Sequence, residues 1–494
     1  MSIDSIHQLF PFVTFPTNCI LAIDEQNGIA TNNKIPWSIH KDRQFFHTVT
    51  TSSPKGKKNV VIMGRKTWEQ LPLKILNDRI NIVLTKTVNK KYKEGLYFCE
   101  NVVDALKLIL LLSNTISINE IFICGGKELY ELFINYPCPI IKKLYVTKIK
   151  KNYNTNTIVN MNLELYKEIK LTSVNTFDNN SVSTIDMDFY EYERIQNTDE
   201  LGYLNLLKRV ITNGHYRQTR NSKTYSCFSD HIEFNLENYI FPLLTTKKMF
   251  LRGIFEELKF FLTGKTDTKL LEQKGVNIWK LNTSRDFLDS VGLDHLEEGD
   301  MGPLYSFQLR HFNAKYNGCH ENYDNQGIDQ FANVLHLLKT DKYSRRILMT
   351  TYNPSQINQA PLPPCHGIAI QFGVENDNKL CCHMYQRSMD LFLGSPFNIA
   401  SYSLLIFIIC ELINNDKYYY GEKFIPGKLS ISIGDLHIYE EHVNVVEEQI
   451  KRIPFHFPTL NFNKKISSID ELEFEHLNLI NYNYYPTLKG KMIA

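Results

Sequence analysis

Signals for metal binding and for disulfide bonding are absent from the sequence. The 494 residues include ten cysteines but no C-x-x-C pair, so zinc-ligand spacing is missing and we expect no metal site. A disulfide framework is not expected in a chain of this size. We therefore expect reduced thiols and a cytoplasmic location.

Signals for membrane insertion and secretion are also missing. The longest uncharged apolar run, Ile399–Cys410, is too short to span a bilayer and predicts a buried helix instead. No basic segment followed by an apolar one stands at the start of the sequence. We expect neither secretion nor membrane attachment.

An excess of one charge sign is missing as well. Lys and Arg number 55 and Asp and Glu 53, so the net charge is +2 and no basic footprint for a specific nucleic-acid partner is visible. The balance is uneven along the chain. Residues 1–196 carry 24 basic and 19 acidic side chains, whereas the remainder carries 31 and 34.

Two hydrophobic patterns follow one another. Residues 18–150 alternate short apolar runs with helical patterns, which is typical of an α/β domain with a covered sheet. An apolar residue at every third position from Leu201 to Val210 begins an amphipathic helix. No linker composition separates the patterns, so we predict two domains, residues 1–196 and 197–494.

Apolar runs predict the main elements of the first half. The predicted strands are Cys19–Ile23, Asn59–Met63, Ile80–Leu84, Ile121–Cys124, Leu144–Ile149 and Phe189–Ile195, and Asp104–Leu112 is a predicted helix. Runs that are apolar throughout suit strands buried on both faces of a parallel or mixed sheet.

A carboxylate among aromatic residues is the first chemical candidate. Asp42 follows Trp37 and precedes Phe46 on a helix predicted to begin near Ser38. On the inner face of that helix, the carboxylate could bind a ligand that presents paired N–H donors. An exposed helical acid paired with Lys41 explains the same spacing.

Two glycine-containing turns follow predicted strands. In Gly64–Trp68, glycine, basic residues and threonine stand at a helix start, which is a plausible phosphate site. Gly125 and Gly126 would let the backbone approach a cofactor closely. Each signal is weak alone, because a glycine turn is usually only a turn and the G-x-G-x-x-G fingerprint is missing.

Taken together, these residues resemble dihydrofolate reductase over about residues 17–195. The ordered set is Cys19–Ile23, Asn27–Ile29, Ile35–Trp37, Asp42, Gly64–Trp68, Arg79–Leu84, Ile123–Gly126, Tyr130 and Tyr145–Thr147. The resemblance implies an α/β domain with a mixed, mostly parallel sheet and flanking helices, and hydride transfer from NADPH to dihydrofolate. The positive excess of residues 1–196 suits these anionic ligands.

The resemblance also implies residue roles. Asp42 would hold the pteridine N3 and 2-amino group and help N5 acquire its proton, with Thr147 behind it. Ala22 and Phe46 would line the folate site, and Arg79 would pair with the α-carboxylate. NADPH would contact Ala22, Gly28, Arg65, Lys66, Thr67, Thr85, Lys86, Gly125, Gly126 and Tyr130. Arg43 departs from the family, which has an apolar pocket residue there, so Arg43 either faces solvent or alters the folate pocket.

A thiol follows a proline-rich segment in the second half. Cys365 follows the rigid segment Pro361–Pro364, and guanidinium groups would stabilise its thiolate as a nucleophile. The candidate arginines, which together also suggest a phosphate dianion, are Arg220, Arg345, Arg346 and Arg387. An inert buried thiol is the alternative, and a papain-like protease fits poorly because its local signature is absent.

Two adjacent glutamates lie on a predicted amphipathic helix, Leu251–Leu262. At about 100° per residue, Glu257 lies about 100° from the centre of the apolar stripe and Glu256 about 160° from it. Glu257 is therefore predicted to reach a cavity edge with a raised pKa, and Glu256 to be solvated. Solvation of both is the alternative.

Two further polar patterns carry candidates. Asn398 lies where a Gly-Pro loop enters a hydrophobic helix, and its amide could both donate to and accept from a ring edge. Helix capping by Asn398 or Ser395 is the alternative. Asp435, His437 and Tyr439 alternate, so they share one strand face as ligand contacts or as a structural polar cluster.

This half resembles thymidylate synthase over about residues 198–494, which implies a larger α+β domain. The segments that carry the resemblance are Phe241–Lys248, Ser284–Ser290, Gly302–Tyr305, Leu362–His366, Tyr385–Ser388 and Pro396–Tyr402. The implied reaction is the methylation of dUMP to dTMP by 5,10-methylenetetrahydrofolate. The whole chain is thus similar to the bifunctional dihydrofolate reductase–thymidylate synthase family, in which the reductase comes first.

The resemblance implies roles here too. Cys365 would attack C6 of the pyrimidine, Glu257 would manage protons at O4 through water, Tyr305 would lie near the water that takes the C5 proton, and Asn398 would select uracil. Other dUMP contacts would be Arg220, His366, Gln386, Arg387, Ser388, Asp390, His437 and Tyr439, with Arg345 and Arg346 from the second subunit. Folate would contact Ile278, Trp279, Asn282, Asp390, Gly394, Phe397 and the closing Ala494.

The exchange of arginines implies a homodimer through the synthase domain. One rival interpretation is a degenerate half that scaffolds the other, suggested by Arg43 and by the unusual loop Asn221–Tyr225. A second is a folate- or mRNA-binding regulatory protein. The near-neutral charge and the intact set of Cys365, Glu257 and Asn398 argue against the second.

Overall fold

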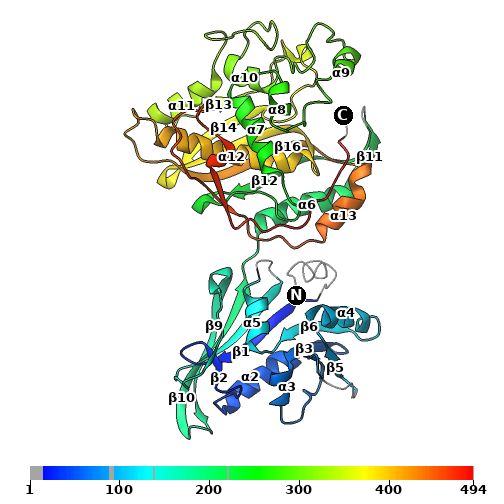
Figure 1. Cartoon of the computed structure of the whole chain (residues 1–494), viewed down its shortest axis with the longest axis vertical. Helices are drawn as coiled ribbons and strands as arrows, with labels where there is room; N and C mark the ends of the chain where they lie inside the picture. The colour runs from blue at the N-terminus through cyan, green and yellow to red at the C-terminus, as the bar shows by residue number, and fades with distance from the viewer. Residues whose placement is uncertain (1–14, 88–93, 137–139, 220–221, 493–494) are drawn as a thin grey trace. The chain divides into compact units, whose positions relative to one another are not determined.

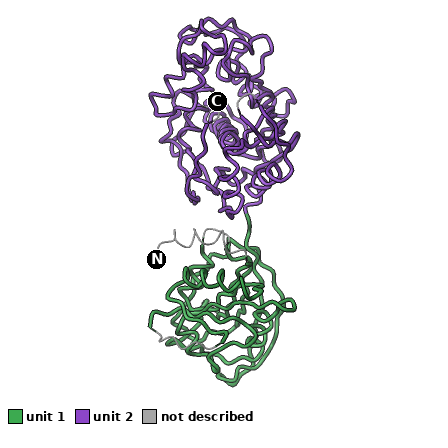
Figure 2. Tube along the Cα trace, turned by 90° about the vertical axis from the view of Figure 1, so that its right-hand side faces the viewer, with its two compact units in different colours: residues 1–196 green, residues 197–494 purple. Residues whose placement is uncertain are grey.

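The computed structural model describes residues 15–87, 94–136, 140–219 and 222–492. The chain divides into two units, Met1–Gln196 (unit 1) and Asn197–Ala494 (unit 2), shown in Figure 2. Each unit buries its own hydrophobic core. The division falls just before Leu201, where the apolar spacing of the sequence becomes helical.

Unit 1 is built on an eight-stranded sheet in the order β5-β4-β3-β6-β1-β7-β10-β9 (Figure 1). The first six strands in that order are parallel, and β10 pairs antiparallel with β7 and β9. The strands are β1 Thr17–Ile23, β3 Lys58–Gly64, β4 Arg79–Leu84, β5 Leu96–Cys99, β6 Ile118–Ile123, β7 Ile141–Ile149, β9 Tyr166–Asp178 and β10 Ser183–Arg194.

The fold confirms the predicted mostly parallel sheet, but the sequence did not indicate β5 or β9. The edge strand β9 reads Y-K-E-I-K-L-T-S-V-N-T-F-D, and most of its residues are exposed, so it lacks the apolar run by which the inner strands were found. The helices of unit 1 are α2 His40–Thr51, α3 Arg65–Glu69, α4 Val102–Leu112, α5 Lys127–Ile134 and the 3-10 turn η2 Leu163–Leu165, and β2 Gly28–Ala30 pairs with β8 Thr157–Ile158.

Unit 2 contains a six-stranded sheet in the order β11-β12-β16-β15-β14-β13. Only β15 and β16 pair in parallel. The strands are β11 His215–Gln218, β12 Lys223–Asn235, β13 Leu348–Met349, β14 Ala369–Glu375, β15 Lys379–Asp390 and β16 Ile425–Tyr439, and β17 Thr459–Phe462 pairs with β18 Leu477–Ile480. This mixed sheet with helices confirms the predicted α+β class.

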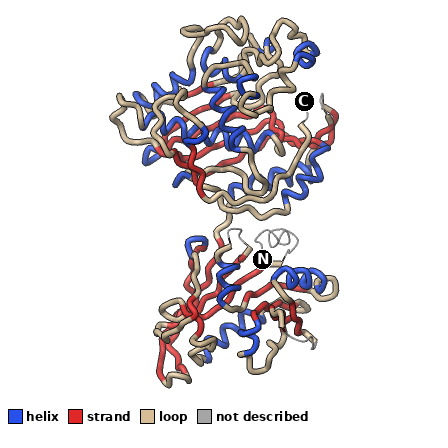
Figure 3. The backbone as a smooth tube through the Cα atoms, viewed as in Figure 1, coloured by secondary structure: helices blue, strands red, loops and turns tan. Residues whose placement is uncertain are grey.

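Helices supply much of the core of unit 2 (Figure 3). They are α6 Thr198–Asn213, α7 Leu251–Leu262, α8 Lys269–Glu272, α9 Arg285–Ser290, α10 Tyr305–His311, α11 Gln330–Thr340, α12 Gly394–Asn414 and α13 Val443–Ile450. The 3-10 turns are η3 Glu237–Tyr239, η4 Ile357–Gln359, η5 Asn376–Asn378, η6 Glu440–His442 and η7 Phe474–His476.

The helix α12 packs against β15 and β16 on one face of the sheet. Along β15, Leu380, Cys382 and Met384 are buried, whereas His383 and Tyr385 on the opposite face are exposed. Among the described residues α12 is the one helix long and apolar enough to cross a bilayer, yet 89% of its most apolar window is buried within the unit. The predicted buried helix is therefore confirmed as the core helix of unit 2.

Candidate active sites

In unit 1, Asp42 lies in the first turn of α2 and is half-buried. The side chains of Thr147, on β7, and of Trp37 hydrogen bond to its carboxylate. Burial raises the pKa of Asp42 to about 6, and these hydrogen bonds and the Arg43 charge oppose the rise. The alternative of an exposed acid paired with Lys41 is wrong, because among the described residues no such ion pair forms.

Two arginines of unit 1, Arg43 and Arg79, have different surroundings. Arg43 is exposed and donates a 3.0 Å hydrogen bond to the Ser38 hydroxyl, so it faces solvent. Arg79, at the start of β4, is 7% exposed. Its Nη1 donates to the Thr50 hydroxyl at 2.6 Å and its Nε to the Asn77 carbonyl at 2.9 Å. Nη2 of Arg79 keeps no partner among the described residues, so it is available to a carboxylate.

The other predicted folate contacts of unit 1 adjoin Asp42. Ala22 is half-buried and lies directly opposite Thr147 in the register of β1 and β7. Phe46 lies one helical turn after Asp42 and packs half-buried against the core. Because β1 and β7 are parallel, their carboxyl ends present Ala22 and Thr147 at the same edge of the sheet.

The two predicted glycine turns lie against each other. The Gly64 N–H donates to the Gly125 carbonyl at 2.8 Å, and the Gly125–Gly126 peptide is cis. A Cβ at Gly125 would lie 3.3 Å from the Thr67 hydroxyl and 3.3 Å from the Tyr130 hydroxyl, and the φ of Gly125 is +114°. The bare backbone beside the start of α3 therefore forms a cradle that a side chain would fill.

The remaining predicted cofactor contacts lie near that cradle, with one exception. Because Gly64 pairs with Leu84 in the register of β3 and β4, Thr85 and Lys86 end on the same edge as α3. Arg65 forms an exposed 2.6 Å ion pair with Glu69. Lys66 is exposed.

Gly28 has a packing reason of its own. A Cβ at Gly28 would lie 1.6 Å from the Thr155 hydroxyl, and its N–H donates to Asp24 at 2.8 Å. Asp24 also accepts a 2.9 Å hydrogen bond from Thr155. The loop geometry thus explains Gly28 without a cofactor, and its predicted cofactor contact stays a prediction.

In unit 2, the thiol of Cys365 lies 3.4 Å from the Tyr305 hydroxyl, which accepts a 2.9 Å hydrogen bond from the Cys365 N–H. Arg387 donates to the Pro364 carbonyl at 3.2 Å and 3.3 Å, which brings its charge beside the thiol. Burial raises the pKa of Cys365 and outweighs the lowering by Tyr305 and Arg387. Because Arg345 and Arg346 were predicted to come from a second subunit, the guanidinium-stabilised thiolate stays a prediction.

Arg345 and Arg346, two of the other arginines predicted around the thiol, are not brought to it within one chain. Arg345 and Arg346 lie exposed on the loop between α11 and β13. Arg220 lies outside the described residues, as does Ala494. Within one chain, Arg387 is therefore the cation of this set that adjoins Cys365 in the described residues.

Aromatic rings stack around Tyr305. The ring of His366 lies 4.4 Å from that of Tyr305 at 12°, and its Nδ1 is 2.9 Å from the Tyr402 hydroxyl. Burial lowers the pKa of His366 to about 3, so it is neutral. Phe261 and Trp279 lie 5.1 Å and 5.9 Å from the Tyr305 ring. This packing fixes the hydroxyl that faces the thiol.

Of the predictions for the two glutamates of α7, the one for the pKa of Glu257 agrees with the structure and the one for Glu256 does not. Glu257 accepts a 2.8 Å hydrogen bond from Trp279 Nε1, and burial raises its pKa to about 7 against that bond. Glu256, by contrast, is 3% exposed and forms a 2.6 Å ion pair with Lys274. The prediction that Glu256 is solvated is wrong, because packing covers most of the circumference of α7 and a partner lysine compensates the buried charge.

Two side-chain amides among the predicted dUMP contacts have unused hydrogen-bonding groups in the described part of the chain. The helix α12 has no side-chain cap, so capping by Asn398 or Ser395 is wrong. Asn398 is 9% exposed, and its amide has no partner among the described residues. Gln386 donates to the Ser388 carbonyl at 3.1 Å, while its Oε1 is buried without a partner in the described part of the chain. Both amides can therefore hydrogen bond to a ligand.

The alternating residues of β16 share one face as predicted. His437 Nδ1 lies 3.0 Å from Asp435, and its ring lies 5.2 Å from Tyr439. Arg217 from β11 also pairs with Asp435. The carboxylate therefore orients the imidazole, which is 9% exposed.

The predicted folate wall of unit 2 includes Asp390, which the backbone that follows it holds in place. Its Oδ1 accepts hydrogen bonds from the backbone of Phe392 at 2.9 Å and of Leu393 at 3.3 Å. A Cβ at Gly394 would lie 3.7 Å from Asp390. The other members are half-buried or buried apolar and polar side chains of adjoining segments: Ile278, Trp279, Phe397 and Asn282.

Comparisons with known proteins cover both units. The family model of thymidylate synthase matches residues 201–494, and that of dihydrofolate reductase matches residues 17–194. A bifunctional dihydrofolate reductase-thymidylate synthase of Zea mays is 35% identical over 96% of each chain. Proteins of the same name from Paramecium tetraurelia and Leishmania major are 36% and 35% identical, and the alignments cover 96% of this chain and 98% and 94% of theirs.

The chain belongs to the bifunctional dihydrofolate reductase-thymidylate synthase family. Unit 1 is its reductase and unit 2 its synthase, so the protein is an enzyme with two activities. It converts dUMP to dTMP and reduces the dihydrofolate that this reaction releases.

Sequence reasoning missed three residues of these sites. Trp37, which hydrogen bonds to Asp42, was used as part of the Ile35–Trp37 motif but given no role in the site, although an indole five residues before a carboxylate was the available signal. Lys247 is 5% exposed and bonds to the Phe392 carbonyl beside the synthase wall. Tyr402 orients His366 and carried no signal beyond its place in the motif.

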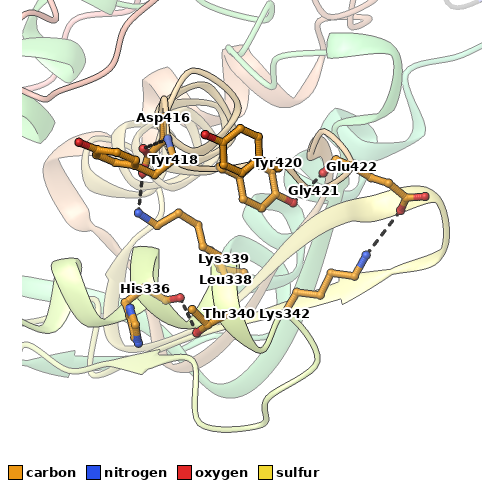
Figure 4. Close-up of a pocket in the computed structure, with 11 residues that line it drawn as sticks. His336, Leu338, Lys339, Thr340, Lys342, Asp416, Tyr418, Tyr420, Gly421 and Glu422 are labelled. Carbon is orange, nitrogen blue, oxygen red and sulfur yellow. Dashed lines mark hydrogen bonds and ion pairs between the residues drawn. The ribbon is translucent and has the colours of Figure 1, made fainter.

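Two cavities on the synthase lie away from the thiol. One, of about 540 Å³, is lined by Lys339, Lys342, Asp416, Glu422 and three tyrosines (Figure 4). Its ion pairs, Lys339–Asp416 at 2.6 Å and Lys342–Glu422 at 3.6 Å, are already formed within the chain. A second, of about 440 Å³, shares Lys339 and Asp416 with it. Neither cavity is lined by Cys365, Tyr305 or Glu257. The reactive groups therefore place the candidate active site at Cys365 and not at either cavity.

Proposed function

We propose that the reductase binds dihydrofolate through the Asp42 carboxylate and the Arg79 guanidinium. The ionised carboxylate accepts from the pteridine N3 and 2-amino donors, and the raised pKa lets the same group carry a proton near neutral pH. Because the reduction consumes one proton at N5, Asp42 is placed to relay it. Arg79 binds the α-carboxylate through Nη2, while Thr50 and Asn77 hold its other nitrogens.

The glycine cradle fits NADPH. A Cβ at Gly125 would crowd Thr67 and Tyr130, and the positive φ also favours glycine, so the backbone at this position carries no side chain. Gly125, Gly126 and Thr67 hold the pyrophosphate by backbone and hydroxyl donors, and Arg65, Lys66, Thr85 and Lys86 offer contacts at the same edge. The dinucleotide, when bound, supplies the hydride for C6 of dihydrofolate.

In the synthase we propose that Cys365 is the nucleophile toward C6 of dUMP. The Tyr305 hydroxyl accepts from the Cys365 backbone and lies 3.4 Å from the thiol, and the ring stacking holds it there. Once the thiol has lost its proton to solvent, attack of the Cys365 thiolate at C6 places negative charge on O4 and C5. Glu257, about half of which is protonated at pH 7, donates a proton toward O4. Asn398 and Gln386 supply open amides for the ring edge.

We also propose that the synthase acts as a homodimer. The exposed face of the six-stranded sheet carries Tyr385 and Phe228, the latter 77% exposed, opposite the face that α12 covers. Arg345 and Arg346 extend from this chain without reaching its own thiol. In a second copy they would bring the positive charge that Cys365 lacks and lower its pKa.

The observation that carries the synthase proposal is the 3.4 Å approach of Tyr305 to Cys365, with Glu257 held by Trp279. The test supplies dUMP, methylenetetrahydrofolate and NADPH, and follows dTMP formation and NADPH oxidation together. Cys365→Ala should stop dTMP formation yet retain NADPH oxidation when dihydrofolate is added. Retained dTMP formation would overturn the nucleophile.

Matched variants test the other proposals. Asp42→Ala should show the reverse pattern. This variant should still form dTMP from the methylenetetrahydrofolate supplied, but it should not oxidise NADPH when dihydrofolate is added. Sedimentation should give a dimer, and a mixture of Arg345→Ala/Arg346→Ala with Cys365→Ala chains should recover part of the dTMP formation, because one site then holds an intact thiol and intact arginines. No recovery would contradict the shared site.

A further inference from the structure

The turn η6, Glu440–His442, directly follows the strand that ends in Tyr439. His442 is fully buried, and its Nε2 donates a 2.8 Å hydrogen bond to the Lys491 carbonyl. Its Nδ1 is buried without a partner among the described residues, so the hydrogen bond to Lys491 is the one polar contact found there for the ring. The buried imidazole therefore binds one backbone carbonyl that is distant in the sequence.

The segment that receives this hydrogen bond is packed as closely as glycine allows. A Cβ at Gly490 would lie 2.7 Å from the Phe392 ring and 3.0 Å from the His442 ring. The φ of Gly490 lies outside the left-handed region, so space rather than backbone conformation requires glycine here. Phe392 and His442 themselves contact each other, with ring centroids 5.1 Å apart.

The surface beneath Gly490 is the folate wall of the synthase. The Phe392 N–H donates to Asp390 at 2.9 Å, and the Phe392 carbonyl accepts from Lys247, whose Nζ also lies 3.8 Å from the centre of the Phe392 ring. Asp390 and the following loop therefore hold one side of Phe392 while His442 and Gly490 occupy another. A change in the position of residues 490–492 acts on this wall directly.

The same turn also touches the nucleotide side. The His442 ring lies 5.8 Å from that of Tyr439. The Glu441 carboxylate accepts a 2.7 Å hydrogen bond from Ser222, and Glu440 accepts one of 2.7 Å from Tyr216. Thus η6 joins the end of β16, the β11–β12 hairpin and the last described segment of the chain.

We propose that His442 is a positioning residue that docks residues 490–492 against Phe392 and so closes the folate side of the synthase site. The proposal rests on the proposed synthase activity and on the predicted folate contacts Asp390, Gly394 and Phe397. Because His442 touches the wall through Phe392 and the segment through Lys491, its loss should weaken methylenetetrahydrofolate binding. His442 meets the nucleotide side only through its ring contact with Tyr439 among the described contacts, whereas its hydrogen bond goes to Lys491, so dUMP binding should change far less than folate binding.

The test compares His442→Leu, which keeps the volume and removes the donor, with His442→Gln, which retains a side-chain N–H. His442→Leu should raise the KM for methylenetetrahydrofolate about fivefold to tenfold, the expected effect of losing one buried hydrogen bond. The dissociation constant of dUMP should stay within about twofold. His442→Gln should recover part of the loss. Reductase activity of the same chain confirms that the protein is intact.

A second measurement follows the segment itself. Backbone hydrogen exchange of residues 486–492 should be about fivefold faster or more in His442→Leu and in Gly490→Ala than in wild type. Lys489→Ala changes an exposed neighbour of the same segment and is the matched control, with wild-type exchange and KM expected.

Unchanged exchange and unchanged folate KM in both His442→Leu and Gly490→Ala would overturn the docking role. So would an equal rise in the constants for dUMP and folate, which indicates general damage. If instead Cys365→Ala retains dTMP formation, the proposed synthase mechanism fails, and the exchange result still decides whether His442 docks the segment.

Discussion

Each unit contains a buried carboxylic acid that titrates near neutral pH, and the two acids accept hydrogen bonds from different numbers of donors. Asp42 of the reductase keeps two hydrogen-bond donors, Thr147 and Trp37, and the nearby Arg43 charge, and its pKa is about 6. Glu257 of the synthase keeps Trp279 alone, and its pKa is about 7. Burial raises both pKa values, and the donors that remain decide how far.

The helix α7 contains one acid proposed to be catalytic and one that is structural. Glu257 and Glu256 are adjacent on α7, yet Glu257 faces the thiol's surroundings with an indole donor, whereas Glu256 is buried with Lys274. A buried acid near an active site is thus not by itself a catalytic one. What distinguishes the two is whether a cation neutralises the charge.

The largest expected effect comes from removing each acid. Asp42→Asn should lower kcat/KM of the reductase about 100-fold or more and leave the synthase unchanged, because a proton relay is worth at least that much. Glu257→Gln should do the same to the synthase and spare the reductase. Both activities are measured on one preparation of each variant. A variant that lowers both activities equally would contradict independent sites.

The next effect concerns stability. Lys274→Met should destabilise the synthase unit by about 1–3 kcal/mol, because Glu256 is left buried with an unpaired charge. The matched control is Lys280→Met, whose 3.1 Å pair with Glu272 leaves the lysine side chain 62% exposed and is expected to contribute less than about 1 kcal/mol. Chemical denaturation measures both. Equal loss in the two variants would show that burial of Glu256 does not matter.

A smaller effect tests the donor count. Trp279→Phe removes the single donor to Glu257, so its pKa should rise and the alkaline limb of the synthase profile should move up by about 0.7 pH unit. Trp37→Phe should move the reductase profile less, since Thr147 still donates to Asp42. A larger shift for Trp37→Phe would reverse the comparison.

The smallest effect is expected at Arg43. Its side chain faces solvent and bonds only to Ser38 among the described residues, so Arg43→Leu should change the KM for dihydrofolate by less than about threefold. Steady-state kinetics with Lys41→Leu as an exposed control measures this. A tenfold change would place the guanidinium in the folate pocket.

Much of both folds was predictable because buried strands and helices carry apolar runs. The inner strands of unit 1 and the helix Leu251–Leu262 were found where the structure has them. The edge strand β9 was missed, since its exposed faces leave a polar sequence. Periodicity placed Glu257 correctly and Glu256 wrongly, because a helical wheel shows one apolar face but not a partner such as Lys274.

Site residues could be predicted where they belong to a sequence motif, but their contacts with residues distant in the sequence could not. The pairing of Cys365 with Tyr305 joins residues 60 positions apart, and only the fold shows that distance. The same holds for Trp37 with Asp42 and for His442 with Lys491, whose partners no local spacing indicates. The charge state of Cys365 depends on burial, which the sequence pattern does not contain.

The central claim is that two acids of different pKa drive the two activities, and pH profiles of both on the same preparation test it most directly. The reductase consumes a proton, so its kcat/KM should fall as pH rises through about 6, where Asp42 loses its proton. The synthase should lose activity as pH rises through about 7, where Glu257 loses its proton. Asp42→Asn and Glu257→Gln should each abolish one inflection. Profiles that coincide, or inflections that survive these substitutions, would contradict the account.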